Sequence, residues 1–438
     1  MLANKLGANV FVTEKNIISD EIKNIFSKNN IAFEEGHTQK AFQNADEILI
    51  SAGIRPDSEI LIKAQASKIK LTGELDFVMP NIKADKIICI TGSNGKSTVT
   101  SLTGHILNKL ALKTGTGGNL GTASAEFTSE NFNAVVLELS SFQLERANNN
   151  LRSCVSVITN LAPDHIDWHG SYKNYVKAKA KILSLRNSDG VGIIQDRDAD
   201  LLSSCDENSL NGKIITLSWN EKPVNNFYGH IFMSESQAFL IINGVKNKLF
   251  DYSDTDLIGA HNLENVAMSL CAVKMSFADK DVSDIKNLLS GFKPLPHRCE
   301  RAGEINGVLY IDDSKGTNVA ASVTAMKSIK FPKIIILGGQ GKGEDYTPLA
   351  EAVKQECEEA VLIGEEAGKI KNALEKSGYT KIHMAGSMRE AVDISYKLAK
   401  SGMCVLLSPA CTSWDMYKNY KLRGEDFCNM VREKMLKV

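Results

Sequence analysis

The stretch ICITGSNGKSTVT, residues 88–100, joins an apolar strand, a glycine-containing turn and the start of a helix. This order is typical of a phosphate-binding loop, in which backbone N–H groups and a helix N-terminus attract phosphate oxygens. Lys96 is positioned to neutralise the β- and γ-phosphates of a nucleotide, and Ser97 or Thr98 to offer a hydroxyl to Mg2+. The usual pattern has glycine at the position of Ile90, so the loop is a variant. The alternative is a glycine-rich helix start with a solvated lysine.

Polar residues follow two further apolar runs. AVVLELSSFQLE (134–145) places Glu138 near the end of its strand, and VSVITNLAPDHIDWHG (155–170) places Asp164, His165 and Asp167 past the next strand. Ligands of open parallel sheets bind at the carboxyl ends of the strands, so Glu138 and His165 are expected to face the nucleotide. A carboxylate suits Mg2+ well and histidine less so, which leaves both a metal-binding and a structural role open for His165.

A helical stretch, YVKAKAKIL (175–183), comes next and carries three lysines. Composition alone favours a solvated basic face, and nothing in the spacing distinguishes one lysine from another.

The bulk composition indicates a globular protein of several domains. At roughly 150 residues per domain, 438 residues predict two to three domains. The net charge of -1 gives no reason to expect nucleic acid or an anionic membrane as partner. Nine cysteines without a CxxC pair indicate reduced thiols. The apolar runs are strand-length and no signal peptide is recognised, so a cytoplasmic protein without a membrane partner is expected.

Apolar runs alternate with helical stretches, which predicts parallel α/β sheets in three domains: 1–85, 86–293 and 294–438. Between Lys213 and Ser253, three strand-like runs follow one another without a helix, which predicts a small antiparallel addition. The opening LANKLGANVFVTEKN predicts a helix end, a turn and a strand. A parallel unit normally starts with a strand before that helix, so the first domain is expected to lack its first strand.

The third block has polar loops after its apolar runs, namely PHRCE, DDSKGTN, GGQGKG and SPACTSWDMYKNY. Arg298, Lys315 and Lys342 are cations that suit a transferring phosphoryl group or a substrate carboxylate. GGQGKG lacks the spacing of a dinucleotide fingerprint. Cys411 as a nucleophile is a weaker alternative, because no histidine lies near it in sequence.

Taken in order, TGSNGKST, GGNLG, LELSSFQLE, NLAPDHIDWHG, YVKAK, GAHNLENVAMS, PHRCE, DDSKGTN, LGGQGKG and SPACTSWDMYKNY resemble the motifs of the Mur ligases of peptidoglycan synthesis. The last motif, with Arg423–Gly424, is similar to that of the D-glutamate-adding members. The resemblance covers nearly all of the chain after residue 50, and the family's loop variant explains Ile90.

The resemblance implies a three-domain α/β enzyme, with a Rossmann-like N-terminal domain, a central P-loop ATPase-type domain and a Rossmann-like C-terminal domain. It implies that ATP and Mg2+ activate the carboxylate of UDP-N-acetylmuramoyl-L-alanine as an acyl phosphate, which the amine of D-glutamate then attacks. A monomer is expected. The cations of the third block can reach ATP in the central domain only if the C-terminal domain swings in, so domain closure is also expected.

The resemblance also assigns residues. Those implied to bind ATP are Gly92, Ser93, Asn94, Gly95, Lys96, Ser97, Thr98, Asn265, Arg298 and Asp313. The implied metal ligands are Ser97, Glu138, His165 and Lys179, the last as a carbamate, and the implied catalytic residues are Lys96, His165 and Lys179. The implied substrate contacts are Asn119 and Ser140 for the muramoyl substrate and Lys315, Thr317, Lys342, Ser413 and Tyr420 for D-glutamate.

This sequence departs from the family pattern at Trp414 and Tyr420, which are bulkier or more polar than expected beside the amino acid. Without the first strand, no uridine-site residues are assigned. Three alternatives stay open: another Mur or folylpolyglutamate-type amide ligase, a P-loop nucleotide switch, and an inactive binding protein. The DNPR motif of diaminopimelate-adding relatives is missing.

Overall fold

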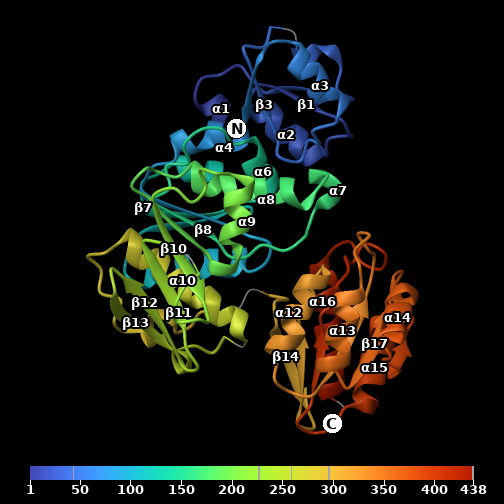
Figure 1. The fold of residues 1–438 in the computed structure, drawn as a ribbon. Coiled ribbons are helices and arrows are strands. Elements are labelled where there is room, and N and C mark those ends of the chain that lie inside the picture. The colour runs from blue at the N-terminus through green and yellow to red at the C-terminus, as the bar shows by residue number, and fades with distance from the viewer. Residues whose placement is uncertain (43, 225–226, 258, 294–295, 437–438) are drawn as a thin grey trace.

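The strands of the chain form four separate sheets in the computed structural model, which describes residues 1–42, 44–224, 227–257, 259–293 and 296–436. Helices and strands alternate along most of the chain, which confirms the predicted α/β class. Figure 1 shows an N-terminal region, a larger central region beneath it, and a C-terminal region beside the central one.

The N-terminal region contains two small parallel sheets, β1 with β2 and β3 with β4. Its elements are α1 (Leu2–Lys5), β1 (Phe11–Glu14), α2 (Asp20–Lys28), β2 (Ala32–Glu35), η1 (Gln39–Phe42), β3 (Glu47–Ile50), α3 (Glu59–Ala66) and β4 (Lys70–Gly73). The predicted opening of a helix, a turn and a strand is confirmed. Within β1, β2 and β3, all of them fully described, no residue is buried. Parallel strands usually have both faces covered, so this region contributes little core.

The central region holds a nine-stranded sheet in the order β13-β12-β11-β10-β9-β8-β5-β7-β6. Its strands are β5 (Ala84–Thr91), β6 (Thr114–Gly118), β7 (Phe132–Glu138), β8 (Val155–Ile158), β9 (Val191–Gln195), β10 (Lys213–Ser218), β11 (Gly229–Met233), β12 (Gln237–Ile242) and β13 (Val245–Asp251). Its helices are α4 (Glu74–Val78), η2 (Met79–Asn81), α5 (Lys96–Lys109), η3 (Ser124–Thr128), α6 (Ser141–Arg146), α7 (Ile166–His169), α8 (Tyr172–Ser184), η4 (Asp196–Asp198), α9 (Ala199–Cys205), η5 (Tyr252–Asp254), α10 (Ala260–Ser276) and α11 (Ile285–Leu289).

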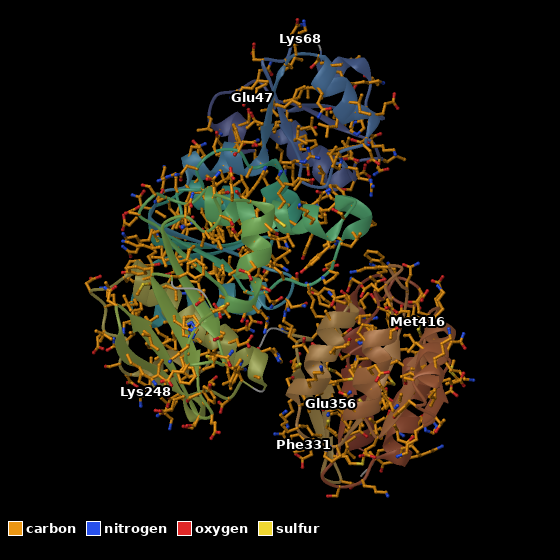
Figure 2. The ribbon with its side chains drawn as sticks, in the orientation of Figure 1. Glu47, Lys68, Lys248, Phe331, Glu356 and Met416 are labelled. Carbon is orange, nitrogen blue, oxygen red and sulfur yellow. The ribbon has the colours of Figure 1, made fainter. Side chains whose placement is uncertain are left out.

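The predicted antiparallel addition is partly wrong. β10 and β11 pair in parallel, because the chain between them returns to the same end of the sheet, and only β12 and β13 run antiparallel to their neighbours. The addition also extends the central sheet instead of forming a sheet of its own. Its outer strand, β13, carries lysines such as Lys248, which lies at the far edge of the central region (Figure 2). Charged side chains on an edge strand discourage pairing with another chain.

Alternate side chains of β5 enter opposite core layers. Ile88 and Ile90 pack with residues of α5 and α10, whereas Ile87 and Cys89 pack with residues of α6 and α8. Successive side chains of a strand point to opposite faces, so a strand covered on both faces is apolar throughout. Helices on both faces therefore fix β5 in the middle of the sheet, where its carboxyl end carries the phosphate loop.

The C-terminal region holds a six-stranded sheet in the order β14-β15-β19-β16-β17-β18, parallel except for β14. Its strands are β14 (Glu300–Ile305), β15 (Val308–Asp312), β16 (Lys333–Gly338), β17 (Glu359–Ile363), β18 (Ile382–Met384) and β19 (Cys404–Leu407). Its helices are α12 (Val319–Ser328), α13 (Thr347–Glu356), α14 (Ala367–Lys376), α15 (Met388–Leu398) and α16 (Tyr420–Met435). The first three helices pack on one face, and α15 and α16 on the other.

The domain limits stay predictions. The limit at residue 85 falls within the first residues of β5, and the limit at 293 borders residues 294–295, part of the KPLPHR stretch, which lie outside the described residues. All nine cysteines are free. Among the described helices, none combines the length and apolar character needed to cross a membrane.

Candidate active site

The phosphate loop lies between the end of β5 at Thr91 and the start of α5 at Lys96, as the sequence predicts. Gly92 and Gly95 have φ angles of 145° and 81°. A side chain at Gly92 would collide with Thr159, and a Cβ at Gly95 would lie 2.6 Å from Asn265 Oδ1. Both positions therefore require glycine, for conformation and for space.

A partly buried lysine, Lys96, and a buried one, Lys179, converge on one backbone carbonyl of this loop. Lys96 Nζ donates to Gly92 O and Ser93 O at 2.8 Å each, and Lys179 Nζ also donates to Gly92 O at 2.8 Å. Burial and then the charge of Lys96 hold the pKa of Lys179 well below its usual range. Burial also lowers the pKa of Lys96. The site thus favours a neutral amine at Lys179.

Glu138, at the end of β7, presents a carboxylate toward the same loop region. Its side chain is 3% exposed, and Asn119 Nδ2 donates to Oε1 at 3.1 Å. Oε2 is buried without a hydrogen-bond partner among the described residues. A buried carboxylate oxygen left unpaired is costly, and a divalent cation is the ligand that would satisfy it.

The turn that carries Asp164 and His165 follows β8. His165 has a left-handed backbone (φ 52°), precedes α7, and packs against Phe142 with ring centroids 4.8 Å apart. Burial lowers the pKa of His165, partly opposed by Asp164, so the imidazole is neutral and able to ligate a metal. Burial raises the pKa of Asp164, but the charges of Lys342, His165 and Lys96 outweigh it and lower the pKa overall.

Ser140 lies at the N-terminus of α6, where its hydroxyl takes part in a capping box with Gln143. Its predicted contact with the muramoyl substrate thus involves a hydroxyl that also caps a helix.

Contacts between the central and C-terminal regions close the site. Arg298 Nη2 donates to Ser97 Oγ at 2.9 Å, and Lys342 Nζ lies 3.5 Å from Asp164 Oδ1. Two of the predicted C-terminal cations thus reach the phosphate loop and the Asp164 turn. The two regions therefore touch in this structure, and the predicted swing of the C-terminal region stays a prediction.

A pocket lies at this junction. Its wall draws predicted ATP-binding residues from both regions, together with a predicted amino-acid ligand: Asn94, Gly95, Thr98, Asn265, Arg298, Asp313 and Lys315. Glu138, His165 and Lys179 are not part of this wall, so the predicted nucleotide and metal residues occupy adjoining places.

Asp313 and Lys315 have shifted acidities within the same loop. Burial raises the pKa of Asp313 to about 7, partly opposed by a hydrogen bond from Ser408. Burial and the charge of Arg298 lower the pKa of Lys315 to about 8. Lys315 Nζ lies 4.0 Å from the centroid of the Tyr420 ring.

The other predicted glutamate ligands lie on neighbouring loops. Thr317 follows Lys315 and is partly buried, and Ser413 is 2% exposed beyond β19. Cys411 is 1% exposed, and burial raises the pKa of its thiol to about 11. The thiolate is the reactive form, so this burial disfavours the alternative of a Cys411 nucleophile.

Arg423 is a residue whose role the sequence did not reveal. Although only 1% exposed, it donates to Ser314 Oγ and O at 3.0 and 2.8 Å, and to Cys411 O and Thr412 O at 3.0 Å each. Burial lowers the pKa of Arg423 to about 10. One guanidinium thus ties the loop that carries Lys315 to the loop that carries Ser413.

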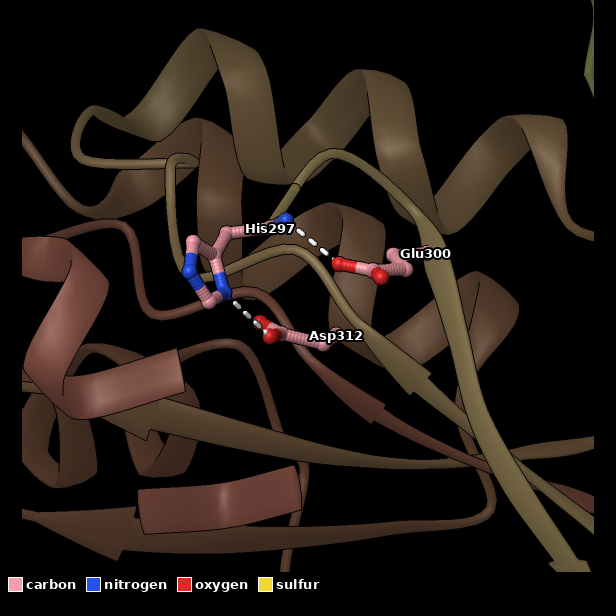
Figure 3. A group of neighbouring side chains, drawn as sticks. All are labelled: His297, Glu300 and Asp312. Carbon is pink, nitrogen blue, oxygen red and sulfur yellow. Dashed lines mark hydrogen bonds and ion pairs between the residues drawn. The ribbon is translucent and has the colours of Figure 1, made fainter. Parts of the chain in front are cut away.

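A second unforeseen group is the cluster of His297, Glu300 and Asp312 (Figure 3). His297 Nδ1 lies 2.7 Å from Asp312 Oδ2, and His297 N donates to Glu300 Oε2 at 2.9 Å. The Asp312 hydrogen bond, partly opposed by burial, raises the pKa of His297. These bonds account for the cluster and hold the backbone that leads into Arg298.

The phosphate loop lies at the carboxyl end of β5, and cationic loops of the C-terminal sheet face it. This arrangement defines a class of nucleotide-dependent enzyme. Three family models match in the order of that architecture: the MurD N-terminal domain over residues 1–60, the Mur ligase middle domain over 90–273, and the Mur ligase glutamate ligase domain over 297–411. The chain belongs to the Mur ligase family.

Two relatives that match nearly the whole chain carry the name of the same enzyme. The UDP-N-acetylmuramoylalanine–D-glutamate ligase of Bacteroides fragilis is 34% identical over 437 residues, covering 99% of this chain and 96% of the relative. The enzyme of the same name from Clostridioides difficile is 35% identical over 434 residues, covering 97% and 93%. The fold matches that of MurF ligase from Thermotoga maritima in complex with ADP, with a TM-score of 0.62 at 16% identity, covering 100% and 97%.

Proposed function

We propose that this chain is an ATP-dependent ligase that joins D-glutamate to UDP-N-acetylmuramoyl-L-alanine in the synthesis of peptidoglycan precursors. The proposal rests chiefly on the meeting of two sets of residues: Arg298 and Lys342 of the C-terminal region contact Ser97 and Asp164 of the central region. The relatives that match nearly the whole chain bear the corresponding name.

The nucleotide would lie between the two regions. Its phosphates would be held by the backbone of residues 92–98 and by Lys96, with Arg298 meeting the γ-phosphate and with Asn265 and Asp313 at the nucleoside side. Preorganised cations and N–H groups stabilise the charge that develops during phosphoryl transfer. The activated carboxylate becomes an acyl phosphate, whose phosphate is a far better leaving group than hydroxide.

Mg2+ would be held by Ser97, Glu138, His165 and a carbamylated Lys179, and when bound it supplies positive charge against the phosphates. The donor set fits such an ion, since Glu138 Oε2 is buried without a partner among the described residues and burial keeps His165 neutral. A neutral Lys179 amine is also the form that adds CO2.

Asn119 and Ser140 would contact the muramoyl substrate or its metal. The glutamate ligands would be cations and hydroxyls, as a dicarboxylate requires: Lys315, Thr317, Lys342, Ser413 and Tyr420. Lys96, His165 and Lys179 would serve catalysis by orienting and neutralising the reacting groups. We further propose a monomeric, cytoplasmic enzyme with domain limits near residues 85 and 293.

The test is phosphate release from ATP and Mg2+, with and without each acceptor. Release that requires both UDP-N-acetylmuramoyl-L-alanine and D-glutamate is the expected result. Release with another amino acid or with a folate acceptor would instead indicate a related amide ligase. Release that needs no acceptor would indicate a nucleotide switch, and no release under any condition would indicate a binding protein.

A further inference from the structure

Asp164 and Lys342 form an ion pair at the junction of the two regions. Lys342 Nζ lies 3.5 Å from Asp164 Oδ1, and the two side chains are 26% and 12% exposed. Asp164 follows β8 of the central region, whereas Lys342 lies on the loop after β16 of the C-terminal region. The pair therefore bridges the place where phosphate chemistry and amino-acid binding must meet.

The neighbouring acidic side chains each accept a hydrogen bond from another group, and Glu138 is also proposed to hold Mg2+. Glu138 accepts from Asn119, Asp313 accepts from Ser408 at 2.6 Å, and Glu344 accepts the backbone N–H of Val319 at 2.8 Å. Asp164 accepts the backbone N–H of His165, and its side chain otherwise faces Lys342 and the His165 imidazole. Its Oδ2 lies 3.7 Å from His165 Nε2.

We propose that Asp164 binds the α-ammonium group of the incoming D-glutamate, and that the substrate replaces the Asp164–Lys342 pair with two pairs of its own. One carboxylate of the amino acid pairs with Lys342, and its ammonium group pairs with Asp164. This inference rests on the proposed function and adds to it the residue that recognises the amine.

The exchange leaves every charge paired. A half-buried lysine or aspartate that loses its partner is costly, so an anion alone would bind at Lys342 only by stranding Asp164. An α-amino acid carries both a carboxylate and an ammonium group, so it leaves neither Lys342 nor Asp164 without a partner. The exchange also brings the amine nitrogen, which becomes nucleophilic only after the ammonium group loses a proton, beside His165 and next to the residues proposed to hold the metal and the activated carboxylate.

The discriminating experiment compares D-glutamate with glutarate, which has both carboxylates but no amine. Wild-type enzyme is expected to bind D-glutamate more tightly than glutarate, measured as KM in phosphate release and as the competitive inhibition constant. Asp164→Asn is expected to raise the KM for D-glutamate about tenfold to hundredfold, the loss of one charged hydrogen bond. The same variant leaves glutarate inhibition unchanged or makes it stronger.

Matched variants separate this role from a structural one. Asp167→Asn changes an exposed aspartate of the same turn and is expected to leave both constants unchanged. Lys342→Met is expected to weaken D-glutamate and glutarate together. If Asp164→Asn has no turnover, calorimetry with a nonhydrolysable ATP analogue and UDP-N-acetylmuramoyl-L-alanine gives the same comparison of the two ligands.

Equal weakening of both ligands in Asp164→Asn would overturn the proposal, as would wild-type enzyme that binds glutarate as tightly as D-glutamate. A changed KM for ATP with an unchanged KM for D-glutamate would also overturn it. Failure of the proposed function looks different, because wild-type enzyme would then show no phosphate release that depends on D-glutamate.

Discussion

The central and C-terminal regions hold their charged site residues in different ways. Lys179 and Glu138 of the central region are 2% and 3% exposed and lie beside the carboxyl edge of a sheet covered on both faces. In the C-terminal region, Lys315 and Lys342 lie on loops. The loop of Lys315 is held by contacts from elsewhere in the region, above all those that Arg423 of α16 donates to Ser314, Cys411 and Thr412.

This difference indicates a division of labour. The central region is organised for phosphate and metal by its own packing, because β5, β7 and β8 fix the positions from which its residues project. The C-terminal half of the site is complete only when its loops are tied together and brought against the central region. Loss of a phosphate- or metal-binding residue of the central region should therefore abolish activation of the carboxylate, whereas loss of a C-terminal tie should affect amino-acid use alone.

The largest effect is expected for Lys96→Met. Removing the cation that contacts the phosphate loop should lower kcat for phosphate release by about 10³-fold, the scale of losing a preorganised electrostatic contact. Lys109→Met alters an exposed lysine of the same helix and should leave kcat unchanged. If Lys96→Met retained more than a tenth of the activity, the claim that the central region is organised for phosphate binding would be contradicted.

Arg423→Met should impair the C-terminal half of the site, which binds the amino acid. It leaves the buried carbonyls of Ser314 and Cys411 without a donor and removes one of the two donors to Thr412 O, which costs about 3 kcal/mol and lowers kcat/KM for D-glutamate by about 100-fold. The KM for ATP should change little. Thermal unfolding measures the stability loss, and steady-state kinetics measures both substrates.

Two variants keep this test sharp. Arg423→Lys retains a charge with fewer donors and should fall between wild type and Arg423→Met. Arg432→Met, on the exposed side of the same helix, should behave as wild type. An Arg423 variant that harms ATP and D-glutamate equally would show that the two halves of the site are not separable.

Carbamylation of Lys179 is the next largest expected effect. Because burial and Lys96 lower its pKa, the amine is neutral at a lower pH than an ordinary lysine and available to CO2. Activity in CO2-free buffer should drop by at least about tenfold, because the proposed Mg2+ site loses one ligand and even the outer-sphere partners of metal ligands contribute on this scale. With ¹³C-bicarbonate, a carbamate signal should appear in wild type and in Lys181→Gln, and be absent in Lys179→Gln.

Local patterns account for what the sequence predicted well. The strand, glycine turn and helix around Lys96 are neighbours in the chain, and parallel-sheet logic places Glu138 and His165 at one edge. The structure also explains what composition left open among the lysines of α8. Lys179 lies on the buried face with Tyr175, four residues before it, whereas Lys181 donates to carbonyls outside the site.

The sequence did not reveal features set by distant contacts. Arg423 and Ser314 are 109 positions apart, and only the packing of α16 brings them together. A Cβ at Gly424 would lie 2.6 Å from Asp312 Oδ2, so the RG pair combines a tie with a close approach. The pairing of β10 and β11 was predicted wrongly because strand direction depends on where the connection returns, which periodicity does not encode.

The smallest expected effect concerns the acidity of Lys315. Its pKa of about 8 lies below that of an ordinary lysine because of burial and Arg298, so raising the pH through 8 removes the charge that would hold a glutamate carboxylate. Between about pH 7.5 and 8.5, kcat/KM for D-glutamate should fall about threefold relative to Lys315→Arg, whose guanidinium stays charged. The ratio of the two profiles cancels the titration of the substrate amine, which is common to both. A ratio of the two kcat/KM profiles that does not change with pH would show that amino-acid binding does not need the charged form of Lys315. Lys342 would then be the principal cation of the C-terminal half.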